Sequence, residues 1–79
     1  MNAKRRKELE KLVERIQGII ADLEVLRDEE QECFDNLPES LQESERGERM
    51  EDNVSNMDAV IDSLESASDE LEDAISESY

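Results

Sequence analysis

Residues 9–37 read LEKLVERIQGIIADLEVLRDEEQECFDNL, and residues 50–78 read MEDNVSNMDAVIDSLESASDELEDAISES. In each stretch apolar side chains recur at alternating steps of three and four residues. The first series is Leu9, Leu12, Ile16, Ile19, Leu23, Leu26, Glu30, Cys33 and Leu37. The second series is Met50, Val54, Met57, Ile61, Leu64, Ser68, Leu71, Ile75 and Ser78. Such spacing is typical of the seam of a coiled coil or helix pair, and it predicts an all-α fold.

The break between the two stretches predicts how the helices are connected. Pro38 disfavours helical geometry at Leu37, so we expect a helix over residues 3–37, a loop over 37–43 and a helix over 44–78. Ser40 together with Glu43, or Ser44 alone, is a candidate cap for the second helix. Because the loop is short, we expect an antiparallel, coiled-coil-like two-helix hairpin that forms a single domain over residues 1–79.

Further apolar residues flank both predicted seams and widen them beyond what two helices can cover. They are Val13, Ile20 and Phe34 in the first helix, and Val60, Ala67 and Ala74 in the second. We expect a second copy to cover this stripe, in a homodimer that forms a four-helix bundle. The alternative is a monomer that uses the stripe on a target protein.

The charge of the chain is strongly negative and unevenly distributed. There are 24 acids against 9 bases, for a net charge of −15. Residues 1–27 have a net charge of +2, residues 28–50 of −7 and residues 51–79 of −10, with no base after Arg49. Direct binding to nucleic acid or to an anionic membrane is disfavoured, because both need clustered Lys and Arg. A basic protein surface is the expected partner.

The acidic residues on the expected helices recur at steps that place their carboxylates roughly 5 to 10 Å apart. That spacing is comparable to the phosphate spacing along a nucleic acid strand. It favours a nucleic-acid mimic that occupies a basic groove, and the alternative is a solvated face that keeps a small protein in solution. The candidate partner-binding residues are Asp28, Glu29, Glu32, Asp58, Asp62, Glu65, Asp69 and Glu72.

Residue types that carry chemistry are scarce. The chain has no His and a single cysteine, Cys33, so it lacks the ligands of a zinc site and the usual base for a nucleophile. No spaced Asp/Asn loop typical of calcium sites is present. We therefore expect no enzymatic activity, no cofactor and no metal. The basic cluster Lys4–Lys7 is expected to neutralise the acidic end of the second helix, and the absence of a long apolar run favours a cytoplasmic protein.

Residues 34–48, FDNLPESLQESERGE, resemble the central turn of small acidic helical proteins of bacteriophages and bacterial mobile elements. The resemblance implies a bacterial host cytoplasm. Small acidic phage proteins are often inhibitors of host defence nucleases, so it also implies an anti-defence inhibitor or regulator that docks on a basic, nucleic-acid-binding defence protein. The alternative function is a structural coiled-coil adaptor or oligomerisation protein whose contact surface is the stripe of Val13, Ile20, Phe34, Val60 and Ala67.

Overall fold

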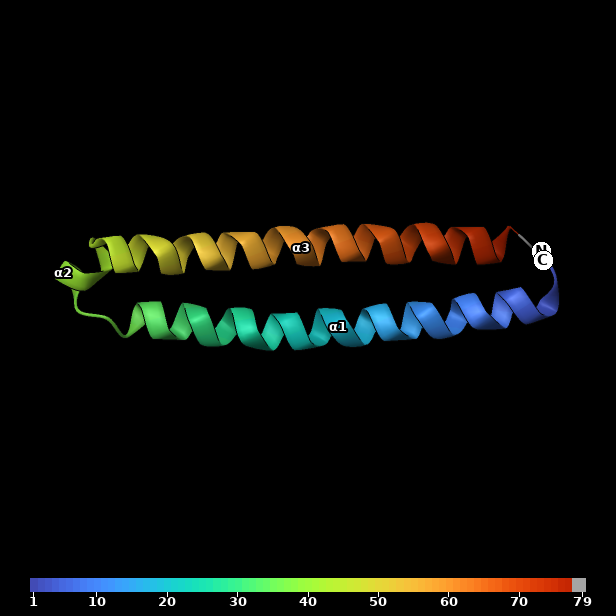
Figure 1. The fold of residues 1–79 in the computed structure, drawn as a ribbon, viewed down its shortest axis with the longest axis horizontal. Coiled ribbons are helices and arrows are strands. Elements are labelled where there is room, and N and C mark those ends of the chain that lie inside the picture. Colours follow the sequence, from blue (N-terminus) through green and yellow to red (C-terminus); the bar gives the residue numbers. More distant parts are fainter. Residues whose placement is uncertain (78–79) are drawn as a thin grey trace.

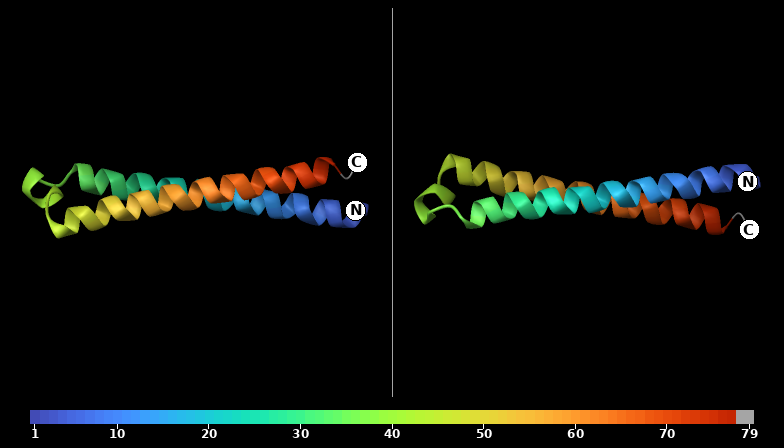
Figure 2. Two further views of the ribbon diagram at one scale, coloured as in Figure 1. Left: turned by 90° about the horizontal axis from the view of Figure 1, so that it is seen from above. Right: turned by 90° about the horizontal axis from the view of Figure 1, so that it is seen from below.

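The structure, a computed structural model, describes residues 1–77. This part of the chain forms three helices, α1 (Ala3–Asp35), α2 (Glu39–Gln42) and α3 (Glu45–Ser76), and contains no strand. The two long helices lie side by side in opposite directions and make a rod of 58 × 14 × 12 Å (Figures 1 and 2). The predicted all-α class is confirmed for the described residues, and the predicted helix end at Ser78 lies outside them.

Side-chain and backbone hydrogen bonds set both ends of α1. The Asn2 side chain accepts a hydrogen bond from the backbone N–H of Arg5 at 2.8 Å and caps the first turn. The helix ends at Asp35, two residues earlier than predicted, ahead of Pro38. The backbone N–H of Asn36 donates to the Glu32 carbonyl at 3.0 Å, and that of Leu37 donates to the Phe34 carbonyl at 3.0 Å.

The predicted loop contains the short helix α2, which ties the two long helices together. The Gln42 side-chain amide donates to the Phe34 carbonyl at 3.0 Å, so it adds a second hydrogen bond to a carbonyl at the end of α1 that also accepts from Leu37. Ser44 caps α3 by accepting from the Gly47 backbone N–H at 3.4 Å, and its hydroxyl also donates to the Leu41 carbonyl. The cap of α3 is therefore Ser44 and not Ser40.

Gly47 of α3 lies against the backbone of Gln42, the last residue of α2. The residue is buried, and a Cβ at this position would lie 2.1 Å from the Gln42 carbonyl oxygen. A distance this short is a steric clash with backbone, so only glycine fits here without a shift of α2. The glycine therefore allows the chain to turn from α1 into α3 within nine residues, 36–44.

The seam of α3 is the one predicted from the sequence. Ile61, Ser68 and Ile75 are buried. The remaining seam positions within the described residues are half-buried, namely Met50, Val54, Met57, Leu64 and Leu71. Each of these faces α1, so along α3 the three-and-four spacing identified the packed face correctly.

The seam of α1 was predicted in part incorrectly. Leu12, Ile19 and Leu26 are 43%, 49% and 53% exposed, and Cys33 is exposed as well. Val13 and Ile20, which were predicted to flank the seam, are buried in it. The observed series consists of Leu9, Val13, Ile16, Ile20, Leu23, Arg27, Glu30, Phe34 and Leu37, all buried or half-buried. The predicted and observed series share every second position and differ by one residue at the others.

The charges on α3 explain why α1 packs through the observed series, which corresponds to a different rotation of α1 about its own axis. In an antiparallel helix pair, corresponding edges of the two seams face each other. One edge of the α3 seam carries Asp58, Glu65 and Glu72. The predicted rotation would have turned Val13 and Ile20 towards these carboxylates, whereas the observed rotation turns Gln17 and Glu24 to that edge and buries the two apolar residues.

Candidate functional site

The helix pair has two opposite flanks of different chemistry. We call the first the apolar flank, and it consists of Leu12, Ile19, Leu26 and Cys33 of α1 with Val60, Ala67 and Ala74 of α3. We call the second the acidic flank, and it consists of Glu10, Glu24 and Asp28 of α1 with Asp58, Asp62, Glu65, Asp69 and Glu72 of α3. Members of each set repeat at seven residues or at steps of three and four, so they share one side of their helix.

Side-chain hydrogen bonds between α1 and α3 mark both flanks. On the acidic flank the Gln17 amide donates to the Glu72 carboxylate at 3.2 Å, and the Arg27 guanidinium donates to Asp58 at 3.0 Å. On the other side of the pair, the Asn53 amide donates to the Glu30 carboxylate at 3.1 Å. Asn53 precedes Val60 by seven residues, so this bond lies on the apolar flank. The two flanks are therefore separated by the packed seam.

The five acids that α3 contributes to the acidic flank form a continuous stripe. We call Asp58, Asp62, Glu65, Asp69 and Glu72 the acidic stripe. They follow one another at steps of four, three, four and three residues, and all five are exposed. Within residues 1–77, no group donates a hydrogen bond to the side chains of Asp62, Glu65 or Asp69. These three carboxylates are therefore available to an external cation.

Arg27 is the cation that lies within the acidic flank, and the sequence analysis did not single it out. Its guanidinium contacts Asp58 at 3.0 Å and Asp28 at 3.2 Å, and its side chain is 28% exposed. The hydrogen bond that Arg27 donates to Asp58, followed by the one it donates to Asp28, raises the pKa of Arg27. One end of the acidic stripe is thus already neutralised by a residue of α1. The signal in the sequence was the position of this base, four residues after Leu23 and seven after Ile20, on the same face of the helix.

The three candidate residues of α1 do not all lie beside the acidic stripe. Asp28 joins it, because it shares the Arg27 guanidinium with Asp58. Glu32 lies one turn beyond Asp28, further from α3. Glu29 lies three residues after Leu26 and therefore borders the apolar flank. The structure brings together six of the eight candidate acids and leaves Glu29 and Glu32 outside this group.

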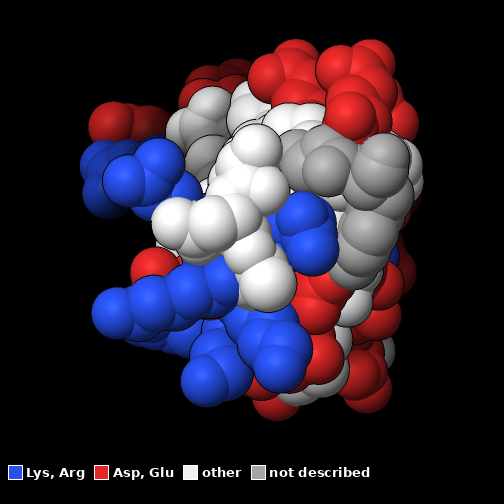
Figure 3. Space-filling view, turned by 90° about the vertical axis from the view of Figure 1, so that its right-hand side faces the viewer, with Lys and Arg blue, Asp and Glu red and all other residues white. Residues whose placement is uncertain are grey.

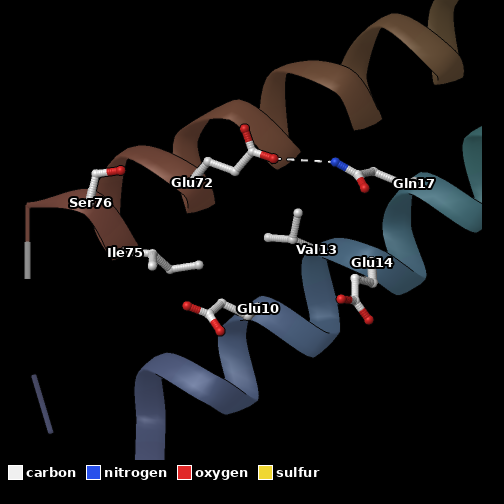
Figure 4. A pocket seen from close by; sticks show the side chains of 7 residues that line it. All are labelled: Glu10, Val13, Glu14, Gln17, Glu72, Ile75 and Ser76. Atoms are coloured by element: carbon white, nitrogen blue, oxygen red, sulfur yellow. Dashed lines mark hydrogen bonds between the residues drawn. The ribbon is translucent and has the colours of Figure 1, made fainter. Parts of the chain in front are cut away.

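An open hollow of about 440 Å³ lies on the acidic flank near the chain termini (Figure 4). Glu10 and Glu14 of α1 line one side, and Glu72 and Ser76 of α3 line the other. Val13 and Ile75 form its floor, where the seam opens between the helices. The lining carries carboxylates and no base, so the hollow extends the negative surface along the rod.

Bases and acids separate at the end of the rod where the termini lie. Lys and Arg gather along α1 on one side of this end, and Asp and Glu cover α3 on the other (Figure 3). Within the described residues no salt bridge joins Lys4, Arg5 or Lys7 to Glu72, Asp73 or Glu77. Lys4, Arg5 and Lys7 therefore stand beside these acids of α3 without a salt bridge to them, and they leave the acidic stripe open.

The structure brings together no metal-binding constellation among the described residues, since no three His, Cys, Asp or Glu side chains converge on one point in residues 1–77. In the same range, none of the helices combines the length and the apolar composition that a membrane span requires. The chain matches no protein-family model, no curated protein and no solved structure.

Proposed function

We propose that this chain is a non-enzymatic binding protein that lays its acidic stripe on the basic, nucleic-acid-binding surface of another protein. The observation that carries the proposal is the stripe itself. Five exposed carboxylates follow one edge of α3, and the helix has no Lys or Arg after Arg49. Three of the five, Asp62, Glu65 and Asp69, accept no hydrogen bond from the described residues.

The geometry of the stripe supports imitation of a phosphate backbone. Steps of three and four residues correspond to a rise of roughly 4.5 to 6 Å, and the whole stripe covers roughly 21 Å of helix. A nucleic acid strand presents its charges at a comparable density. Because α3 is held straight against α1, the carboxylates are presented in one arrangement, which lowers the entropy cost of docking. A disordered acidic segment would have to be ordered on binding.

The partner is proposed by its chemistry. A groove lined with Lys and Arg, built for DNA or RNA, matches a rigid row of carboxylates. The resemblance of residues 34–48 to small acidic phage proteins supports a bacterial cytoplasm as the setting and a host defence nuclease as the target class. In this proposal the chain acts as an inhibitor because the groove holds either the protein or its nucleic acid.

A second candidate function uses the opposite side of the molecule. Leu12, Ile19, Leu26 and Val60 are large apolar side chains that lie exposed on the apolar flank. They favour a structural adaptor, or a homodimer, over a solvated surface. The contact surface predicted from the sequence is not available for this role, because Val13 and Ile20 are buried in the seam. Salt separates the two functions, because electrostatic docking weakens steeply as ionic strength rises and apolar docking changes little.

The experiment begins with capture of binding proteins from a bacterial lysate, followed by titration of the purified partner at low and high salt. The test variant carries Asp62→Lys, Glu65→Lys and Asp69→Lys. Asp58 is left in place because it anchors Arg27, and its reversal would disturb the fold. We expect the variant to lose at least about 100-fold in affinity at low salt, and DNA or RNA to compete with the unmodified protein.

A matched control carries the same change of charge away from the stripe, as Glu43→Lys, Asp52→Lys and Glu77→Lys. These three acids are exposed and lie outside the acidic flank. We expect this control to keep most of the affinity. If the stripe variant binds as tightly as the unmodified protein, or if nucleic acid does not compete, the mimicry proposal fails and the adaptor function takes its place.

A further inference from the structure

The apolar flank is a continuous exposed surface on both long helices. It carries Ile19, Leu26 and Val60 at 49%, 53% and 47% exposure. Alanines at 67 and 74 complete its α3 side. The acidic flank has no such residues at the corresponding positions of either helix. Soluble proteins seldom leave such a stripe uncovered, so the asymmetry between flanks points to an association surface.

The part of the apolar flank nearer the loop is also poor in charge on α3. From residue 53 to residue 67, the side chains on and beside this flank are Asn53, Asn56, Ala59, Val60, Ser63, Ser66 and Ala67. Small uncharged residues allow another helix to approach closely, at the distances found in four-helix bundles. The acids of α3 lie mostly on the other flank, so a partner that covers the apolar flank need not desolvate them.

Charges that border the flank on α1 are sorted by sign along the helix. Two bases lie towards the N-terminus: Arg5 precedes Leu12 by seven residues, and Arg15 follows it by three. Two acids lie towards the C-terminus: Asp22 precedes Leu26 by four residues, and Glu29 follows it by three. Glu8 is the single acid in the N-terminal part of this border. A two-fold axis across the rod would set the basic part of one copy beside the acidic part of the other.

We propose that a second copy of this chain packs on the apolar flank in the antiparallel direction, so that two rods form a four-helix bundle. Leu12 and Leu26 lie equally far on either side of Ile19, which places the two-fold axis near Ile19. A parallel arrangement would bring together the two loop ends, which are strongly acidic. In the antiparallel bundle both acidic stripes face outwards. The proposal rests on the fold and the flank, and it does not depend on the proposed partner of the acidic stripe.

Sedimentation equilibrium tests the surface. The unmodified chain should sediment at twice its mass of 9.1 kDa at micromolar concentration. Leu26→Glu should raise the dissociation constant of the dimer at least about 100-fold, because each of the two symmetric copies would bury one added carboxylate in the interface. Ala21→Glu adds the same charge at an exposed site of α1 outside the flank and should leave the dimer intact. Circular dichroism checks that both variants keep their helices.

The proposed dimer surface is wrong if the unmodified chain stays monomeric at high concentration. A dimer that Leu26→Glu leaves unchanged overturns it equally. These outcomes do not bear on the acidic stripe, whose test uses a different partner and different residues.

The direction of packing has its own test. A variant with Cys33→Ser and Ser40→Cys carries one thiol, in α2 at the loop end of the rod, where a spin label lies outside the proposed interface. In the antiparallel bundle the two labels should be separated by a distance close to the 58 Å length of the rod. In a parallel bundle they would lie within about 25 Å, roughly two helix diameters. A short distance between the labels would overturn the antiparallel arrangement.

Discussion

The two long helices share one spacing and differ in how many of their faces are apolar. In α3 the seam residues are bordered by acids on one edge and by Asn53, Val60, Ala67 and Ala74 on the other, so only the seam carries a full series of large apolar side chains. In α1 two overlapping apolar series share Leu9, Ile16 and Leu23 and diverge at the positions between them. Periodicity therefore identifies the packed face of a helix only when the neighbouring positions do not form a second series of large apolar residues.

The largest expected difference in the free energy of unfolding is between substitutions at two adjacent isoleucines of α1. Ile20 is 8% exposed and Ile19 is 49% exposed. Ile20→Glu puts a carboxylate into the seam and should cost about 4 kcal/mol, enough to unfold the helix pair. Ile19→Glu should change the free energy of unfolding by less than about 1 kcal/mol when measured on the monomer. Urea denaturation followed by circular dichroism provides both values, and equal losses would mean that α1 packs through the other series.

A smaller effect compares the glycines of the two helices. Gly47→Ala should lower the free energy of unfolding by about 2 kcal/mol, because the new methyl group meets the Gln42 carbonyl at the junction of α2 and α3. Gly18→Ala, where nothing lies within 4 Å of the added Cβ, should raise it by about 0.5 to 1 kcal/mol through helix propensity. Thermal unfolding of both variants measures the pair. If Gly47→Ala stabilised the protein, the distance between α2 and α3 at this position would be large enough to accept a methyl group.

The smallest effect concerns the seam of α3. Ser68 is buried beside Ile20, under an open hollow of about 230 Å³ on the acidic flank. Ser68→Leu should fill part of this space and raise the free energy of unfolding by about 1 kcal/mol. The matched control, Ser66→Leu, changes an exposed serine of the same helix and should gain less than about 0.5 kcal/mol. A gain of the same size in both variants would trace the effect to helix propensity instead of packing.

The sequence predicted much of this architecture, and the parts it missed have identifiable causes. The helical class and the break ahead of Pro38 are local properties of the chain, so they follow from residue types alone. The sequence offered both Ser40 and Ser44 as caps of the second helix, and the structure selects Ser44. The early end of α1 at Asp35 and the helix α2 depend on Gln42 reaching back to Phe34. A side chain that satisfies the end of another helix is a tertiary contact, and the residue pattern around it carries no sign of it.

The candidate site divides in the same way. The acids of α3 were grouped correctly on one face, because residues at steps of three and four on one helix always neighbour each other. The grouping of the acids of α1 with them depends on the rotation of α1. Glu29 and Glu32 were predicted to bind the partner together with these acids, but Glu29 borders the apolar flank and Glu32 lies further from α3. Arg27 was overlooked because a lone base near an apolar seam resembles a surface residue until its partner on α3 is known.

Periodicity, capping residues and charge by themselves determined that this chain forms two long helices joined by a short connection, with a continuous row of acids along the second. These properties depend on neighbours within a few residues, where the geometry of a helix is known in advance. Tertiary structure decided which side of α1 is buried, that Arg27 and Gln17 reach the acids of α3, and that the remaining apolar residues of both helices share one flank. Those outcomes depend on the rotation of one helix against the other, and that rotation is selected by the unfavourable contact of apolar side chains with carboxylates across the pair.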